Sequence, residues 1–255
     1  MIRAAFFDID GTLVSFKTHK VSEGTIKAFD ELHKQGIRTF ISTGRPQQII
    51  PKMPVSFDGF ITMNGGHVFV GETILHSSPI PEEDAKRWIR YAYENKITTF
   101  AFMPDAICLN QGDPALAALR AQLDFELPPI WTMDELMDKK INQFIVMQSP
   151  DKDKETLEML PGCAMPRWHP AFSDLIPNGI SKAVGMQKIL DHFGIKQDET
   201  IAFGDGGNDI EMLDFAKIGV AMGNAADEVK RHADYVTTDV DDEGIFNALK
   251  SLGII

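Results

Sequence analysis

Cysteine is scarce in this sequence: its 255 residues include two, Cys108 and Cys163. The two lie far apart and lack the close spacing of a metal-binding motif, which argues against a disulfide framework and against a zinc site. Both are interpreted as buried, small apolar side chains. We therefore expect a protein of a reducing compartment, the cytoplasm.

Long apolar runs are also missing. No segment reaches the ~18 consecutive apolar residues that indicate a membrane-spanning helix. The short apolar run in MIRAAFFDID meets acidic residues at once, unlike the apolar centre of a signal peptide. Neither a membrane anchor nor an export signal is expected.

Positively charged residues are also fewer than negatively charged ones. There are 25 Lys and Arg residues against 37 Asp and Glu, so the formal net charge is -12. The average field repels phosphate backbones and anionic lipid surfaces, and we expect no nucleic-acid or membrane partner. A negative net charge still allows a locally positive binding site. Hydrophobic residues make up 44%, enough for a buried core in one large or two smaller domains.

Strand and helix patterns alternate in the first and last parts of the chain. RAAFFD predicts a buried strand, Ser22 an N-cap for a helix that ends at Gly36, and 37–42 a second strand. Residues 57–77 predict a strand followed by a hairpin. The alternation resumes in 178–255, and strands that alternate with helices at this spacing favour a parallel sheet.

The middle of the chain has a different pattern. Residues 81–96 predict an amphipathic helix, followed by short β-like runs and by helices at 115–123 and 153–160. Pro-containing joints flank the whole segment. We therefore interpret 82–177 as an α+β domain inserted into an α/β domain.

Two carboxylates, Asp8 and Asp10, follow the first strand in FFDIDGTLVS. Residues i and i+2 of an extended chain point to the same side, so the two charges would crowd one space unless a cation or a proton separates them. An Asx-type turn that ends the strand is the simpler structural alternative.

A second acidic cluster repeats this arrangement. In GDGGNDIEML, Asp205 follows an apolar strand, and Asn208 and Asp209 open a helix. Ligands of open α/β sheets bind at the carboxyl ends of strands, so Asp8, Asp10 and Asp205 converge if their strands are neighbours. Oxygen ligands of this kind suit Mg²⁺.

A cation site of this kind could be purely structural, but further residues favour phosphate chemistry. Thr43 offers a hydroxyl after the strand 37–42, next to Gly44, where backbone N–H groups can face an anion. Lys182 adds a positive charge at the start of a helix. Together with Mg²⁺, these groups match the needs of a phosphoryl group, and a carboxylate beside the metal can attack phosphorus.

Four segments carry a resemblance to a known family. FFDIDGTLVS, ISTGR, ISKAVGM and FGDGGNDIEML resemble motifs I to IV of the haloacid dehalogenase-like hydrolase superfamily, in the order typical of its Cof-type branch. The resemblance implies a Rossmann-like catalytic core made of 1–81 and 178–255. It implies that 82–177 is a type IIB α+β cap, which determines substrate specificity.

The same resemblance implies residue roles. Asp8 would be the nucleophile that forms an aspartyl-phosphate, and Asp10 the general acid for the leaving alcohol and then the base for the attacking water. Both would contribute to the metal site, Asp10 through its main-chain carbonyl. The separation of roles is physically sensible, because only a carboxylate that does not attack is free to move protons.

The other motif residues would complete the site. The resemblance implies that Thr43 hydrogen-bonds the phosphoryl oxygens and that Lys182 neutralises the nucleophile and the transferring group. Asp205 would bind the metal directly, supported by Asn208 and Asp209. Lys and Mg²⁺ would thus act where negative charge develops during phosphoryl transfer.

Three further residues are candidates for substrate binding. Gly44 and Arg45 follow Thr43, although Arg45 could equally be an exposed structural residue. Asn64, in MNGG, resembles an Asn-Gly turn that lines the active site in the family; a hairpin turn is the alternative. In the inserted domain, the mixed aromatic and polar stretch 167–175 could line a sugar-binding surface or form strands.

The function that these residues predict is a Mg²⁺-dependent phosphatase of small phosphorylated metabolites, with sugar (hexose) phosphates expected first and nucleotide-like or pyridoxal phosphates next. A phosphotransferase of the phosphomannomutase kind is an alternative, as is a non-catalytic sensor of metal and phosphate.

An EF-hand is disfavoured, because Thr12 and His19 stand where its loop needs oxygen-rich ligands. Dehalogenation is disfavoured because Asp10 suits a phosphoester leaving group. A monomer or a weak homodimer is expected.

Overall fold

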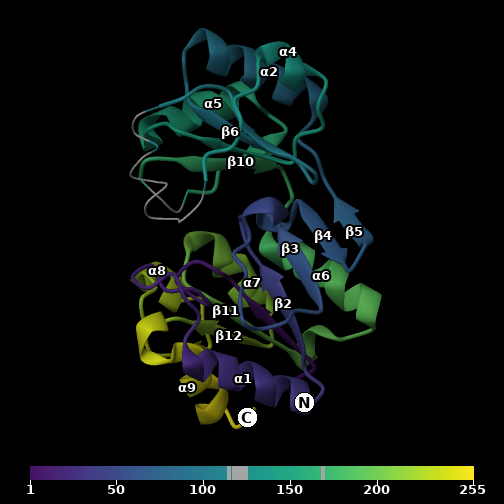
Figure 1. Cartoon of the computed structure of the whole chain (residues 1–255), viewed down its shortest axis with the longest axis vertical. Helices are drawn as coiled ribbons and strands as arrows, with labels where there is room; N and C mark the ends of the chain where they lie inside the picture. Colours follow the sequence, from purple (N-terminus) through teal and green to yellow (C-terminus); the bar gives the residue numbers. More distant parts are fainter. Residues whose placement is uncertain (114–115, 117–125, 168–169) are drawn as a thin grey trace. The chain divides into compact units, whose positions relative to one another are not determined.

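The structure is a computed structural model that describes residues 1–113, 116, 126–167 and 170–255 (Figure 1). The chain forms two compact units. One consists of Met1–Gly44, Pro51–His76 and Ser181–Ile255, and the other of Arg45–Ile50 and Ser77–Ile180. Within the described ranges, no helix is both long and apolar enough to cross a membrane.

The first unit is built on a sheet whose strands run in the order β13-β12-β11-β1-β2-β3-β4-β5. Pairing is parallel from β13 to β3 and antiparallel between β3 and β4. The strands of this sheet are β1 (Ala4–Phe7), β2 (Arg38–Ser42), β3 (Gly59–Thr62), β4 (His67–Val70), β5 (Thr73–Ser77), β11 (Thr200–Gly204), β12 (Ile218–Ala221) and β13 (Tyr235–Val236).

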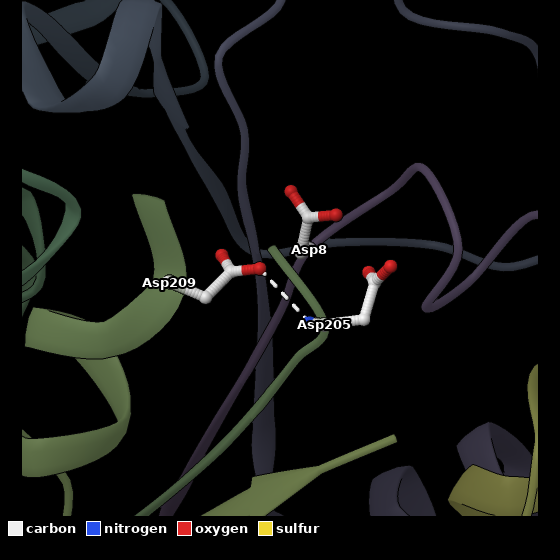
Figure 2. A group of neighbouring side chains, drawn as sticks. All are labelled: Asp8, Asp205 and Asp209. Carbon is white, nitrogen blue, oxygen red and sulfur yellow. Dashed lines mark hydrogen bonds between the residues drawn. The ribbon is translucent and has the colours of Figure 1, made fainter. Parts of the chain in front are cut away.

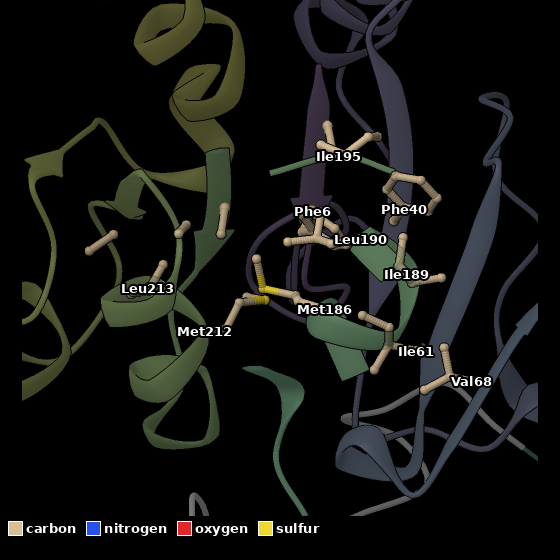
Figure 3. Packing of buried hydrophobic residues seen from close by; sticks show 14 of the residues in the cluster. Phe6, Phe40, Ile61, Val68, Met186, Ile189, Leu190, Ile195, Met212 and Leu213 are labelled. Carbon is tan, nitrogen blue, oxygen red and sulfur yellow. The ribbon is translucent and has the colours of Figure 1, made fainter. Parts of the chain in front are cut away.

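Helices cover both faces of this sheet. Successive strand residues point to opposite faces, so apolar side chains on each face need a covering layer. Phe6 stacks on Phe40, with ring centroids 4.9 Å apart, and belongs to a core that includes side chains of α6, α7 and α8 (Figure 3). Phe7 points the other way, and its ring centroid is 4.8 Å from that of Phe29 on α1, the helix that contacts α9. The helices of this unit are α1 (Glu23–Lys34), α6 (Lys182–Phe193), α7 (Ile210–Phe215), α8 (Asp227–Lys230) and α9 (Gly244–Ser251).

Local signals explain where these helices begin and end. The Ser22 side chain accepts a hydrogen bond from the Thr25 backbone N–H and caps α1, as predicted, and Gly36 follows the helix with a φ of +73°. Helix α6 is capped in the same way by Ser181 and ends at Gly194, which has a left-handed conformation.

The second unit contains a smaller sheet with the strand order β7-β6-β8-β10-β9. Figure 1 shows α2, α4 and α5 on one side of it, where Trp88 of α2 and Phe144 of β8 belong to one apolar core. Its elements are α2 (Glu82–Glu94), β6 (Thr99–Phe102), β7 (Ile107–Leu109), α4 (Met133–Met137), β8 (Gln143–Val146), α5 (Asp153–Met159), β9 (Cys163–Ala164) and β10 (Ser173–Pro177).

The architecture confirms an α/β fold with a parallel-sheet core. The units change over at 76/77 and 180/181, whereas we expected 81/82 and 177/178. The chain leaves the larger sheet at the end of β5, before the Pro-containing joint that marked the boundary in the sequence. The helix expected at 115–123 lies almost entirely outside the described residues. The sequence analysis did not predict the short helix α4.

Candidate active site

The three strands that precede the acidic and hydroxyl motifs are neighbours, in the order β11-β1-β2. Asp8 follows β1, Asp205 follows β11 and Thr43 follows β2, so all three lie at the same carboxyl edge. Figure 2 shows Asp8, Asp205 and Asp209 around one space. This is the edge where open α/β sheets bind their ligands.

Three carboxylates meet at this edge. Each of Asp8, Asp205 and Asp209 offers one oxygen, and these oxygens lie within 4.8 Å of one another. Asp8 and Asp209 are buried, with exposed fractions of 7% and 0%. Carboxylates this close repel one another strongly unless positive charge lies between them or a proton binds.

Lys182 supplies one such positive charge from the first residue of α6. Its Nζ lies 2.6 Å from Oδ1 of Asp8 and 2.5 Å from Oδ1 of Asp209, and its side chain is completely buried. Burial alone would lower the pKa of Lys182, but the charges of Asp209 and Asp8 outweigh it and raise that pKa. The residue therefore stays protonated.

One lysine does not neutralise three carboxylates. Burial raises the pKa of Asp8 to about 7; the charge of Lys182 opposes this rise, and those of Asp209 and Asp10 add to it. Burial, followed by the charges of Asp8 and Asp209, also raises the pKa of Asp205 well above its usual value. Clustered carboxylate oxygens with excess negative charge fit a hard divalent cation, and Asp8, Asp205 and Asp209 could hold one.

Asp209 has a larger place in this site than the sequence analysis assigned to it. We expected it to support the metal ligands, but its carboxylate is itself part of the acidic group. Its Oδ2 accepts a hydrogen bond from the backbone N–H of Asp205 over 3.0 Å (Figure 2). The same oxygen accepts from the N–H of Gly206 over 2.8 Å, while Oδ1 accepts from Lys182. Asp209 thus ties the β11 loop to the lysine.

Asp10 lies apart from the group of three carboxylates and is only partly buried. It begins a tight turn in which the Gly11 N–H donates to the carbonyl of Val14 over 2.9 Å. Gly11 has a φ of +86°, and a Cβ there would lie 2.3 Å from the Asp205 carboxylate. Only glycine permits both this backbone conformation and this close approach.

Two residues that orient Asp205 were not singled out from the sequence. The Thr12 hydroxyl donates to Oδ1 of Asp205 over 2.8 Å. The Asn224 amide donates to Oδ2 of Asp205 (3.2 Å) and to the carbonyl of Gly11 (2.8 Å). Thr12 belongs to the DGT motif that follows β1, and Asn224 comes shortly after β12. The position of each residue after a strand was the sequence feature that could have marked it as a site residue.

The remaining candidates are divided between the two units. Thr43 is buried and Gly44 lies against Asn64, with 3.3 Å between a Cβ built on Gly44 and the Asn64 amide. Asn208 donates to Oδ1 of Asn64 over 2.9 Å. Arg45 groups with the second unit, where its guanidinium donates to the carbonyl of Ile49.

Part of the stretch 167–175 has structural partners. Arg167 pairs with Asp153 through two hydrogen bonds of 2.9 and 2.7 Å, and it also donates to the carbonyls of Phe172 and Gln148. This guanidinium links α5 to Phe172, the residue before β10, and Asp174 is buried within β10. Residues 168 and 169 lie outside the described residues.

Comparisons with known proteins agree with this geometry. The family model described as haloacid dehalogenase-like hydrolase matches residues 5–249. The putative phosphatase YkrA of Bacillus subtilis (strain 168) is 32% identical over 255 residues, which cover 98% of this chain and 97% of YkrA. The 5-amino-6-(5-phospho-D-ribitylamino)uracil phosphatase YitU of the same organism is 30% identical, over 95% of this chain and 94% of YitU.

Solved structures show the same relationship. The HAD subclass IIB sugar phosphatase BT4131 superposes with a TM-score of 0.93 and 40% identity, over 99% of this chain and 100% of that one. A structure from work on a trigonal-bipyramidal intermediate in a phosphoryl-transfer superfamily has a TM-score of 0.95 and 40% identity, with complete coverage of both chains. The chain therefore belongs to the haloacid dehalogenase-like hydrolases, in their Cof-type branch of phosphatases.

Proposed function

We propose that this protein is a Mg²⁺-dependent phosphatase that hydrolyses small phosphorylated metabolites, sugar (hexose) phosphates first, through an aspartyl-phosphate on Asp8. The observation that carries the proposal is the buried Lys182, whose Nζ lies 2.6 Å from Asp8 in a group of three carboxylates. A buried carboxylate kept beside a fixed ammonium is suited to attack an anionic phosphate without leaving the charge unbalanced.

In the first half of the proposed reaction, an oxygen of Asp8 forms a bond to phosphorus while the bond to the alcohol oxygen breaks. Asp10 gives a proton to that leaving oxygen. In the second half, water attacks phosphorus, Asp10 takes its proton, and the bond to Asp8 breaks to release phosphate. Asp10 can serve as the acid and then as the base, because the first half of the reaction leaves its carboxylate deprotonated.

Other residues would balance charge and hold the phosphate. Lys182 keeps its proton throughout and offsets charge on Asp8 and on the transferring group. Thr43 and the backbone at Gly44 would donate to the phosphoryl oxygens. A divalent cation held by Asp8, Asp205 and Asp209, with the main-chain carbonyl of Asp10, would supply electrostatic stabilisation of the phosphoryl oxygens.

Substrate choice is proposed to rest on the second unit, the α+β domain inserted between the two parts of the core. The sugar phosphatase BT4131, 40% identical to this chain over nearly its whole length, supports sugar phosphates as the first class to test. YitU acts on a phosphorylated ribitylaminouracil, so nucleotide-like phosphates form the second class. Pyridoxal phosphate is included as a third.

The test is release of inorganic phosphate from these three classes, with MgCl₂ or EDTA, by the wild type and by Asp8→Asn. We expect release that requires both Mg²⁺ and Asp8, fastest with hexose phosphates. Isomerised sugar phosphate without free phosphate would favour a phosphotransferase instead. A stability gain with Mg²⁺ and phosphate but no turnover of any compound would favour a sensor.

A further inference from the structure

The turn between β3 and β4 contains three consecutive residues with positive φ: Met63 (+50°), Asn64 (+54°) and Gly65 (+95°). This conformation costs about 1–3 kcal/mol at a residue other than glycine. Met63 and Asn64 are both buried, with exposed fractions of 0% and 2%. A buried, strained turn of this kind persists where the surrounding structure holds it in place.

The first contact of this turn is with the loop that carries Thr43. The backbone N–H of Asn64 donates to the carbonyl of Thr43 over 3.1 Å, and the N–H of Thr43 donates to the carbonyl of Ile61 over 2.9 Å. Gly44 lies so close to the Asn64 amide that a Cβ there would approach it to 3.3 Å. The backbone that follows β2 is therefore held against the turn.

The second contact reaches the loop after β11. The Asn208 amide donates to Oδ1 of Asn64 over 2.9 Å, across 144 positions of sequence. Asn208 lies in the short helical turn Gly207–Asp209, and the next residue, Asp209, receives the hydrogen bond from Lys182. The side chain of Asn64 thus holds the segment that presents Asp209, the carboxylate bound to Lys182.

The third contact is with the start of α6. A Cβ on Gly65 would lie 2.1 Å from the carbonyl oxygen of Ser181, so this backbone approach is closed to every other residue. Ser181 caps α6, and Lys182 is the first residue of that helix. Gly65 therefore limits where α6 can begin, and with it the position of Lys182.

We propose that the turn Met63–Gly65 sets the mutual placement of the three active-site segments that carry Thr43, Asn208 and Lys182, and that Asn64 is a positioning residue. This proposal rests on the proposed function for its kinetic consequence. Asn suits the position because it tolerates a left-handed conformation and carries both an acceptor and a donor. Its acceptor binds Asn208, which gives Asn64 a positioning role; the substrate contact predicted from the sequence stays a prediction.

A double-mutant cycle separates the side chain from the backbone. Asn64→Gly keeps a residue that accepts positive φ and removes only the amide, and Asn208→Ala removes its partner. With p-nitrophenyl phosphate and MgCl₂, we expect each single variant to lower kcat about 10- to 100-fold with little change in KM. The double variant should be no slower than the worse single variant, because both remove one interaction. Multiplied effects on kcat, or losses confined to KM, would overturn the proposal.

A second measurement does not depend on catalysis. Amide hydrogen exchange should become faster in Asn64→Gly at both 43–44 and 205–209, while the centre of β1 keeps its protection. Unchanged exchange in both segments would overturn the proposal. If instead the wild type releases no phosphate but the exchange result holds, the proposed function fails and the placement of the segments stands.

Gly65 offers a matched comparison with Gly36, which has a φ of +73° and no heavy atom within 4 Å of an added Cβ. Ala at either position pays the cost of positive φ, but only Gly65→Ala meets the Ser181 carbonyl. We expect Gly65→Ala to lower kcat at least 10-fold and Gly36→Ala to lower only the melting temperature. Equal kcat values in the two variants would overturn the role of Gly65.

Discussion

The Nζ of Lys182 lies 2.6 Å from Oδ1 of Asp8, although the two residues are 174 positions apart in the chain. Both are buried, and Lys182 binds Asp209 as well. Removing one partner of a buried ion pair leaves an uncompensated charge, which costs more than the loss of an exposed pair. This relationship has consequences for stability that can be measured apart from activity.

Lys182→Met should destabilise the metal-free protein by about 3–5 kcal/mol at pH 8, because Asp8 and Asp209 lose the charge between them. The loss should be smaller at pH 5. The charge of Lys182 holds the pKa of Asp8 down, at about 7, so without Lys182 that pKa is higher and Asp8 binds a proton more readily as pH falls. Urea unfolding in EDTA at both pH values measures the difference.

Lys34→Met is the control, since the Lys34–Glu31 pair is exposed and solvent screens pairs of that kind. Equal losses for Lys182→Met and Lys34→Met would contradict the importance of the buried pair.

Mg²⁺ should stabilise EDTA-treated wild type, because a cation that binds the folded state alone adds about 2.7 kcal/mol at 100 times its Kd. Asp205→Asn should lose most of this gain, since it removes one of the three clustered carboxylates. Melting temperatures with and without MgCl₂ measure the effect. Asp198→Asn, at an exposed position, should keep the full gain. An equal gain in both variants would place the cation elsewhere.

Asn224→Ala should weaken Mg²⁺ binding about 10- to 100-fold, the usual cost of removing a group that orients a metal ligand. Asn224 donates to Asp205 and to the backbone of Gly11, so it holds the ligand and the turn beside it. Titration calorimetry with MgCl₂ measures the Kd. Asn178→Ala is a suitable comparison, because that amide donates to the carbonyl of Pro161 in the second unit. A Kd within twofold of wild type in Asn224→Ala would contradict this role.

Acid should destabilise the first unit through two histidines. His67 Nδ1 and His76 Nε2 are buried and have no hydrogen-bond partner among the described residues. Burial lowers the pKa of His67, helped by the charge of His76, and burial also lowers the pKa of His76, helped by Lys188. Below about pH 6.5, the unfolded chain therefore binds protons that the folded chain resists, and stability falls as pH falls.

The measurement is unfolding free energy at pH 7.5 and 5.5 for wild type and for a His67→Gln/His76→Gln variant. Asp8 acts in the opposite direction over this range, since its raised pKa makes stability fall as pH rises toward 7. The comparison is therefore between the two proteins. The variant should lose less stability on acidification, and an equal or greater loss would contradict the histidine effect.

Much of the first unit could be predicted from the sequence because its signals are local. Alternation at Phe6 and Phe7 depends only on strand geometry, and the Ser22 cap depends on hydrogen bonds within one helical turn. Asp8, Thr43 and Asp205 were found for a similar reason: each stands directly after an apolar strand.

Contacts between distant segments could not be predicted in this way. Asn224 lies 19 positions from Asp205, and its position after β12 does not indicate which carboxylate it contacts. Asp209 was expected to support the site, but its hydrogen bond to Lys182, which joins residues 27 positions apart, could not be predicted from the sequence. Element β10 depends on its pairing with β8 and β9, which a single segment does not encode.

The sequence by itself determined which chemical groups stand at the ends of the strands and which family the chain resembles. Only the tertiary structure decided their electrostatic state. Asp8 has a pKa near 7 because the whole unit buries it, and Lys182 stays charged because two segments far apart in the chain bring carboxylates to it. Desolvation and charge coupling depend on distances in space, and these exist only once the sheet and its loops are assembled.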